Sequence, residues 1–227
     1  MKKLLSLILI LAMLTVAMVS CNKDDPTEDP ANNNPPAETR YTITAEEWAA
    51  VLTLKNYTAA ITTSQKQIIN GGEPEVESVT GTTKSTDTVC YEEQRDGEDV
   101  YSSYIVVENG KNYHMSENDD GTFDVYTAQY GIDSLAEYYT FETVTFADLT
   151  YNAETKAYTF TVSNDSMDAQ YTMWFEDGKV VKLTAVASRE MSHGDMSIYM
   201  EMAVELVITN VGTTTVATPN FERPTED

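Results

Sequence analysis

Along most of the chain, hydrophobic and polar residues alternate with a period of two, the spacing of the two faces of a β-strand. The clearest case runs from Met196 to Ile208, where every second residue is apolar and the residues between them include a serine and two glutamates. Shorter alternating stretches begin at Tyr57, Val100, Tyr158 and Tyr171. The pattern predicts a largely antiparallel sheet with one buried face and one face toward water.

Glycines that follow Asn or Asp mark the turns between these stretches. Asn109-Gly110 fits a type I′ hairpin turn, and similar pairs lie at Asp96-Gly97, Asp120-Gly121 and Asp177-Gly178. The last pair predicts a hairpin whose second strand runs from Lys179 to Ser188. A final short strand is expected over Gly212 to Pro219, before a polar tail.

Two helices are predicted. Thr44 and Glu47 have the spacing of a capping box, so a helix is expected from Ala45 to about Lys55, with Trp48, Val51 and Leu52 on its apolar side. A second helical turn is expected near Ser134, with Glu137 three residues later. The predicted fold is therefore mainly β (α+β): a curved antiparallel half-barrel meander with one or two helices packed on the concave side.

The first helix is too small to cover the predicted sheet. A thirteen-residue strand such as 196–208 spans about 44 Å, whereas the helix spans about 17 Å. The apolar face of that strand can be covered by curling of the sheet, by the second helical segment or by a bound apolar partner. Its methionines suit either an ordinary core or an adaptable binding surface.

If an apolar groove lies between helix and sheet, its lining is expected to come from the apolar faces of the first helix and of two strands. These residues are Trp48, Val51, Leu52, Met173, Phe175, Met196, Ile198, Met200, Met202 and Val204.

The N-terminus has the order of a secretory signal. Lys2 and Lys3 precede an apolar run from Leu4 to Val19, and Ser20 and Cys21 follow. A cysteine at the cleavage point resembles the lipobox of bacterial lipoproteins, which implies a signal over residues 1–20 and acylation of Cys21. A signal with an ordinary peptidase site is an alternative. A membrane-spanning helix is another, although the run is shorter than the roughly 20 residues needed to span a bilayer.

Residues 21–40 are expected to be a disordered tether, because they are rich in Asp, Asn and Pro and carry no apolar residue larger than alanine apart from the cysteine. Residues 41–227 then form a single domain with a short polar C-terminal tail. This organisation predicts an extracytoplasmic protein, lipid-anchored to the cell membrane or to an outer membrane. A formal net charge of −23 argues against nucleic acid as a partner. The membrane and a lipid or amphiphile are the expected partners, and a protein partner is left open.

No candidate catalytic, metal or cofactor site emerges from the sequence, and an enzyme is not expected. Cys90 is interpreted as a small buried hydrophobic residue. Ser192, His193 and Asp195 are too close in sequence to point at one reacting atom, so a turn is favoured over a triad. Two acidic segments are interpreted as solvated turns. Residues 118–124 could offer oxygen ligands to Ca²⁺ but lack EF-hand spacing. The second segment comprises Glu92, Glu93, Asp96, Glu98 and Asp99.

The layout resembles envelope lipoproteins of the LolA-like (lipoprotein-carrier half-barrel) superfamily. The residues that carry the resemblance are Leu149-Thr150-Tyr151-Asn152 through Tyr158, and Trp174-Phe175-Glu176-Asp177-Gly178-Lys179-Val180. It implies a curved sheet with helices across its mouth and, in some members, acyl chains inside. The carriers themselves lack an acylated cysteine, so a shuttling role is not implied. The leading hypothesis is a non-enzymatic, lipid-anchored protein that binds an apolar or amphiphilic ligand. The alternative is a structural or adhesive surface module with a fully packed core.

Overall fold

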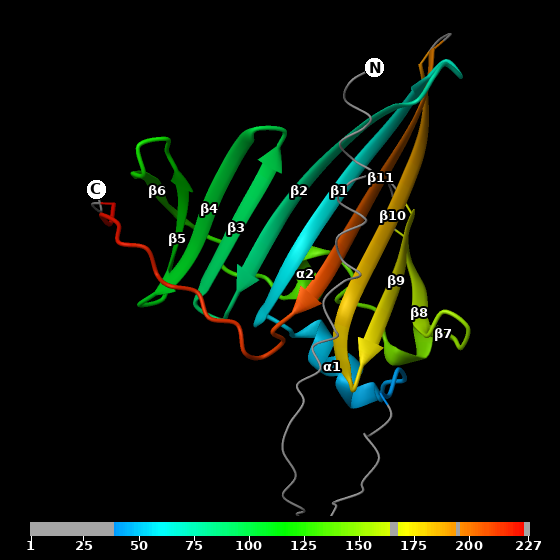
Figure 1. The fold of residues 1–227 in the computed structure, drawn as a ribbon, viewed down its shortest axis with the longest axis horizontal. Coiled ribbons are helices and arrows are strands. Elements are labelled where there is room, and N and C mark those ends of the chain that lie inside the picture. The colour runs from blue at the N-terminus through cyan, green and yellow to red at the C-terminus, as the bar shows by residue number, and fades with distance from the viewer. Residues whose placement is uncertain (1–38, 164–167, 194–195, 225–227) are drawn as a thin grey trace, which may run out of the picture. The chain divides into compact units, whose positions relative to one another are not determined.

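A computed structural model describes residues 39–163, 168–193 and 196–224, in which eleven antiparallel strands form one curved sheet (Figure 1). The strands are β1 (Tyr57–Ile69), β2 (Glu75–Ser85), β3 (Val89–Asp96), β4 (Asp99–Glu108), β5 (Lys111–Glu117), β6 (Phe123–Ala128), β7 (Thr150–Asn152), β8 (Ala157–Ser163), β9 (Asp168–Glu176), β10 (Lys179–His193) and β11 (Met196–Thr209). The expected signal, Cys21, almost all of the tether, and Gly194 and Asp195 lie outside the described residues.

The sheet is built from two meanders joined through the first and last strands. The spatial order is β6-β5-β4-β3-β2-β1-β11-β10-β9-β8-β7, and every neighbouring pair is antiparallel. At the centre, β1 pairs with β11 over a long register from Thr58↔Thr209 to Ile69↔Ile198. The expected curved antiparallel sheet is confirmed. The sequence did not predict the central pairing of the two ends of the domain.

Three short helices connect or cover the strands: α1 (Ala45–Leu52), α2 (Leu135–Tyr138) and the 3₁₀-helix η1 (Phe146–Asp148). The capping box of Thr44 and Glu47 is present, and Ser134 and Glu137 form a second one at α2, as expected. The prediction that the first helix extends to Lys55 is wrong. It ends at Leu52, and the chain then turns directly into β1.

Three of the four predicted pairs lie between consecutive strands; in the fourth, Asp96 is the last residue of β3 and Gly97 begins the turn. Asn109 and Gly110 both have positive φ (53° and 75°), and so do Asp177 and Gly178 (48° and 81°). Two successive residues with positive φ are the requirement of a type I′ turn, whose twist matches that of the strands.

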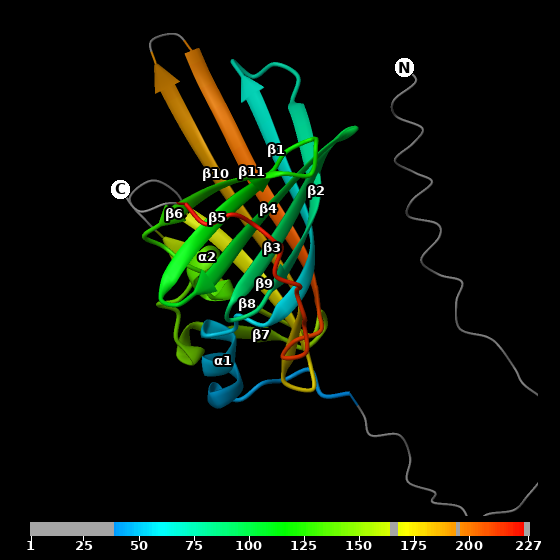
Figure 2. The ribbon, with the colours of Figure 1, turned by 90° about the vertical axis from the view of Figure 1, so that its left-hand side faces the viewer.

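The main core lies on the concave face of the sheet, which is the face covered by α1 and α2 (Figure 2). Trp48 packs on Phe141 and Phe160, with ring centroids 6.0 and 5.6 Å apart. Phe160 stacks on Tyr171 with centroids 4.9 Å apart. Leu206 and Ile208 of β11 are buried in the same cluster. The connection from β6 to β7, which carries α2 and η1, therefore closes one end of the curved sheet.

A smaller core lies on the outer face of β3–β5. Val89, Val106 and Tyr113 are cross-strand neighbours there, and Phe221 from the C-terminal segment packs on Tyr113 with ring centroids 5.4 Å apart. The strand predicted over Gly212 to Pro219 is wrong, because this segment is irregular. Its backbone forms hydrogen bonds with the side chain of Asn56 and not with a neighbouring strand. The Thr214 N–H donates to Asn56 Oδ1 at 2.8 Å, and Asn56 Nδ2 donates to the Thr214 carbonyl at 3.2 Å.

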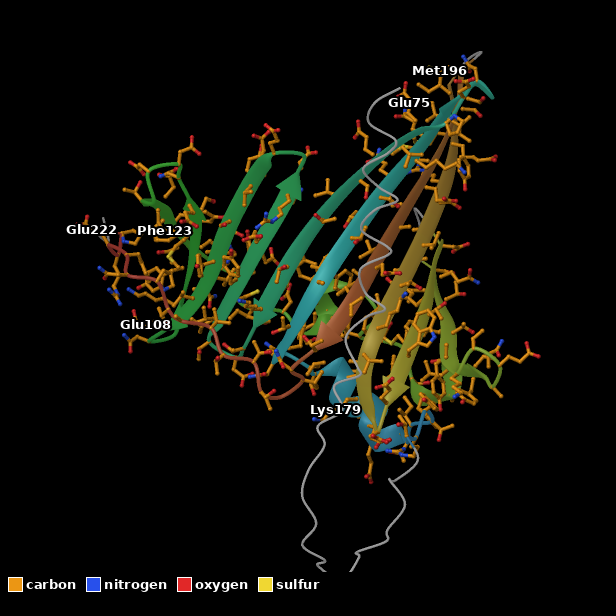
Figure 3. All side chains as sticks on the ribbon, in the orientation of Figure 1. Glu75, Glu108, Phe123, Lys179, Met196 and Glu222 are labelled. Carbon is orange, nitrogen blue, oxygen red and sulfur yellow. The ribbon has the colours of Figure 1, made fainter. Side chains whose placement is uncertain are left out.

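Four strands extend beyond their neighbours. Residues 75–79 of β2 have no partner in β3, and residues 189–193 of β10 have none in β9. Together with the adjoining parts of β1 and β11 they form what we call the projecting strands. Their tips, labelled at Glu75 and Met196 in Figure 3, lie at the opposite end of the sheet from Lys179 and α1.

Candidate ligand-binding groove

A groove of about 510 Å³ lies on the concave face where the projecting strands leave the helices. Its floor is formed by β1 to β5, and α2 lies along one side. The lining residues are Ile61, Thr63, Val79, Thr80, Gly81, Thr83, Glu92, Glu93, Gln94, Tyr101, Ser102, Ser103, Ser116, Glu117, Tyr138, Tyr139 and Val204. This volume falls within the range of small-molecule sites.

Local sequence fixes the position of α2 above the groove. The capping box of Ser134 and Glu137 satisfies the backbone N–H groups at the start of the helix. The Leu135 N–H donates to the Leu54 carbonyl at 2.8 Å, and the Tyr171 hydroxyl donates to the Tyr139 carbonyl at 2.5 Å. These bonds hold both ends of a single helical turn, so Tyr138 and Tyr139 are placed firmly over the strands.

The floor carries a row of hydroxyl groups with one carboxyl among them. Directly paired residues of neighbouring strands share one face, and the register aligns Thr83, Glu92, Ser103 and Ser116 across β2, β3, β4 and β5. Four hydrogen-bonding side chains from four adjacent strands therefore point into the same concave surface.

Burial shifts the titration of the groups around this row. It raises the pKa of Glu92 above the usual carboxyl range, and a hydrogen bond from Tyr138 partly opposes the shift. Burial also raises the pKa of Tyr138 and of the Cys90 thiol to about 12, and that of Tyr57 further still. The surroundings of Glu92 thus disfavour negative charge. The high pKa of Cys90 makes it a poor nucleophile.

The wall toward β11 is apolar, and the same face continues along the projecting strands. Ile61, Val79 and Val204 form this wall. The next residue of β11 on that face is Met202, paired with Gln65 on β1 and Ala187 on β10, and 42% of its surface is exposed. The groove is therefore polar at its floor and continuous with exposed apolar side chains at one end.

Gly81 forms part of the floor between Ile61 and Gln94. A Cβ atom at this position would meet the backbone carbonyl oxygen of Glu93 inside van der Waals contact. The close approach of β2 and β3 here thus requires a residue without a side chain, which also leaves the floor open.

Of the residues expected to line an apolar groove, Val204 lines the one observed. Trp48, Val51, Met173 and Phe175 are buried in the main core, and Leu52 packs against it. Met196, Ile198, Met200 and Met202 lie on the projecting part of β11, on the same face as Val204 but beyond the groove lining. Trp48 packs on Phe141 and Phe160 in the core, and the groove lies farther along the strands.

The interpretation of Glu92 and Glu93 as part of a solvated turn is wrong, because both lie within β3. Glu92 faces the groove, while Glu93 faces outward and pairs with Arg95 at 2.7 Å. The alternation of Cys90, Glu92 and Gln94 with Tyr91, Glu93 and Arg95 was the available signal. This alternation was difficult to recognise because both faces of β3 carry charged residues here.

The acidic segment at residues 118–124 is accounted for by local structure. Asp120 bonds the backbone and hydroxyl of Thr122 within the β5–β6 turn. Within the described residues, no group of three or more His, Cys, Asp or Glu side chains is arranged to hold a metal ion. None of the helices in the described residues has the length and apolarity needed to cross a membrane.

No family model matches the chain, and no curated protein matches it. Among solved structures, the ywiB protein from Bacillus subtilis matches at 14% identity and a TM-score of 0.20, over 67% of this chain and 94% of that one. The structure of MucB in complex with MucA(peri) matches at 10% identity and a TM-score of 0.12, over 75% of this chain and 96% of that one. These scores indicate only a weak resemblance between β-rich proteins. The chemistry of the groove therefore follows from the residues of this chain alone.

Proposed function

We propose that this protein is a non-enzymatic, lipid-anchored protein of the bacterial envelope that binds an amphiphilic molecule in the concave groove. The anchor is the acylated Cys21 expected from the sequence. The observation that carries the binding proposal is the continuity between a hydroxyl-rich floor and an exposed apolar strand face. An amphiphile needs both surfaces side by side, because burying its tail is favourable only if its polar end keeps its hydrogen bonds.

The ligand tail lies along β11 in this proposal. Val204 forms the wall of the groove, and Met202 and Met200 continue the same face outward. Flexible thioether side chains adapt to chains of different shape. Met200 and Met202, which were expected to line a groove, thus contact the ligand beyond the groove itself.

The start of the described chain is fixed to one end of the sheet. The Arg40 N–H donates to Asp177 Oδ1 at 2.9 Å, and the Asp177 N–H donates to the Arg40 carbonyl at 2.8 Å. The start of the domain is thereby fixed at the β9–β10 turn, at the opposite end of β10 from the projecting tips (Figure 3). The projecting tips therefore lie away from the residues at which the described chain begins.

Two matched variants on one strand test the binding proposal. Met202 on the groove face and Val207 on the outer face are exposed to 42% and 46%. The full chain carrying Cys21→Ser would be titrated with N-phenylnaphthylamine, an uncharged fluorophore that brightens in apolar surroundings. We expect Met202→Asp to weaken uptake at least about fivefold, because a carboxylate is costly to bury without a partner. Val207→Asp should leave uptake unchanged.

Equal uptake by the two variants, or no uptake by the parent, would contradict ligand binding on this face. The latter result would favour the alternative of a structural or adhesive module. The exposed Val76, Val186 and Val207 side chains on the outer face of the sheet are the feature that favours that reading. Membrane fractionation of the parent and of Cys21→Ser tests the anchor, since only the parent should pellet with membranes.

A further inference from the structure

The hydrogen-bonding groups of the groove match a ligand with several neighbouring hydroxyl groups. Thr83, Glu92, Ser103 and Ser116 are direct cross-strand neighbours, and such pairs have Cβ atoms about 5 Å apart. Hydroxyls both donate and accept, and a carboxylate accepts at two oxygens. A row of this kind can bond successive hydroxyls of one molecule without leaving a donor or acceptor unpaired.

The charges around the groove disfavour an anionic ligand. The lining residues include Glu92, Glu93 and Glu117 but no Lys, Arg or His. A phosphate, sulfate or carboxylate would therefore enter without a counter-charge, although charge-assisted bonds are the strong ones for such groups. The nearby Arg95 lies on the outer face and is already paired with Glu93.

A cationic ligand is also disfavoured. Of the acidic lining residues, Glu92 has its side chain on the floor, while Glu93 and Glu117 face outward by the strand alternation. Burial raises the pKa of Glu92, so a cation would find one partly desolvated acceptor, already bonded by Tyr138, as its inward-facing counter-charge.

Tyrosines complete the site on the sides. Tyr138 at the end of α2, Tyr139 directly after it and Tyr101 of β4 line the groove. A tyrosine offers an apolar ring face and a polar hydroxyl at its edge. A sugar ring has the complementary arrangement, with C–H groups on its faces and hydroxyls around its rim.

We propose that the groove holds an uncharged, hydroxyl-rich group of the sugar type, with Thr83, Glu92 and Ser103 as its principal hydrogen-bonding partners. This inference rests on the proposed function, because it names the polar end of the same amphiphile. The group belongs either to a glycolipid or to a free sugar.

Four probes separate the inference from the function on which it rests. Octyl glucoside, octyl phosphate, octyltrimethylammonium and glucose would each be titrated by calorimetry into the full chain carrying Cys21→Ser, below micelle-forming concentrations. We expect octyl glucoside to bind at least about tenfold more tightly than either charged octyl compound, and more tightly than glucose. That result supports both proposals and identifies a glycolipid as the source.

Each of the other results would overturn a specific part of the two proposals. Tighter binding of octyl phosphate or octyltrimethylammonium would overturn the sugar-type head group and leave amphiphile binding intact. Glucose binding as tightly as octyl glucoside would support the hydroxyl-rich ligand, identify a free sugar as its source and overturn the tail contact. Binding of none of the probes would overturn both.

A pair of charge-neutralising variants locates the site. Glu92→Gln should weaken octyl glucoside about fivefold and reduce its advantage over octyl phosphate, because the acceptor is weakened and the acidic charge is removed. Glu201→Gln is the matched control, since Glu201 also accepts a tyrosine hydroxyl bond, from Tyr199 at 2.7 Å, but on the outer face. Unchanged affinities in Glu92→Gln, or equal losses in both variants, would overturn the proposal. Circular dichroism of both variants verifies that they are folded.

Discussion

The indole N–H of Trp48 donates a hydrogen bond to the backbone carbonyl oxygen of Val144 at 2.9 Å, and so ties α1 to the connection between α2 and η1. The same side chain is almost fully buried and packs on Phe141 and Phe160. Trp48 therefore links α1 and the connection between α2 and η1 to the sheet. It also supports the end of the groove formed by α2.

Trp48→Phe should lower the free energy of unfolding by roughly 2–4 kcal/mol, because it leaves both a cavity and an unpaired buried carbonyl. Urea denaturation followed by circular dichroism measures the loss. Trp174→Phe is the matched control, since Trp174 is only partly buried and its indole bonds the Thr155 carbonyl at 3.2 Å near the surface. Its cost should stay below about 1 kcal/mol. Similar losses in the two variants would contradict a supporting role for Trp48.

The ion pair of Arg40 and Glu47 should make the domain sensitive to acid. Hydrogen bonding to the Arg40 guanidinium, together with the Thr44 N–H, lowers the pKa of Glu47 to about 2. A carboxyl whose pKa is lower in the folded state contributes stability above its ordinary pKa and loses it as the pH falls toward the folded value. We expect part of the stability to disappear between about pH 4.5 and pH 2.

Glu47→Gln should remove that component and flatten the dependence of the urea midpoint on pH over this range. The control is Glu46→Gln, which removes the same charge from the neighbouring exposed position of the same helical turn. An identical pH profile for Glu47→Gln and the parent protein would show that the pair contributes nothing measurable.

Gly81→Ala should damage both the sheet and the groove. The new methyl group would be driven into the Glu93 carbonyl oxygen, so β2 and β3 must separate. Overpacking of this kind costs roughly 1–3 kcal/mol. The expected result is a lower urea midpoint and weaker N-phenylnaphthylamine uptake. Thr82→Ala, at the next residue on the opposite face, should cost less than about 1 kcal/mol and leave uptake intact. Normal uptake in a destabilised Gly81→Ala variant would place the ligand away from this floor.

Local signals in the sequence predicted local structure well. The capping boxes at Thr44 and Ser134 and the turns at Asn109 and Asp177 depend on residues within a few positions of one another. The pairing of β1 with β11 depends on residues about 130 to 150 positions apart, and the sequence of neither strand specifies its partner. Antiparallel strands of similar hydrophobicity are interchangeable until the whole sheet is assembled.

The candidate site was the least predictable part of the structure because its polar residues resemble those of an ordinary exposed surface. Glu92 occurs in a run of acidic residues, and its position on the inner face follows only from the register of β2 and β3. Trp48 and Phe175 carried the strongest hydrophobic signal and were assigned to the groove, but strongly apolar residues pack tightly on one another and fill the core. An open groove on this sheet requires side chains that tolerate water, such as Ser103 and Ser116.

The titration of Glu92 should make stability fall as the pH rises. Burial raises its pKa in the folded protein, so its contribution is fully present below the ordinary carboxyl value of 4.5 and is lost as the pH rises through the raised value. The groups that face Glu92 are Cys90 on its own strand, Tyr57 on β1, and Tyr138 and Tyr139 at the end of α2. All of these have raised pKa values, so they remain uncharged across this range.

Glu92→Gln keeps the shape of the side chain and removes its charge. The variant should gain stability relative to the parent as the pH increases from about 4.5 toward neutrality, because only the parent must ionise a half-buried carboxyl. Urea midpoints measured for both proteins at each pH give this difference directly, with Glu201→Gln on the outer face as the matched control. A difference that does not change with pH would mean that Glu92 reaches solvent freely. The groove floor would then be wetter than its hydroxyl row and covering tyrosines indicate.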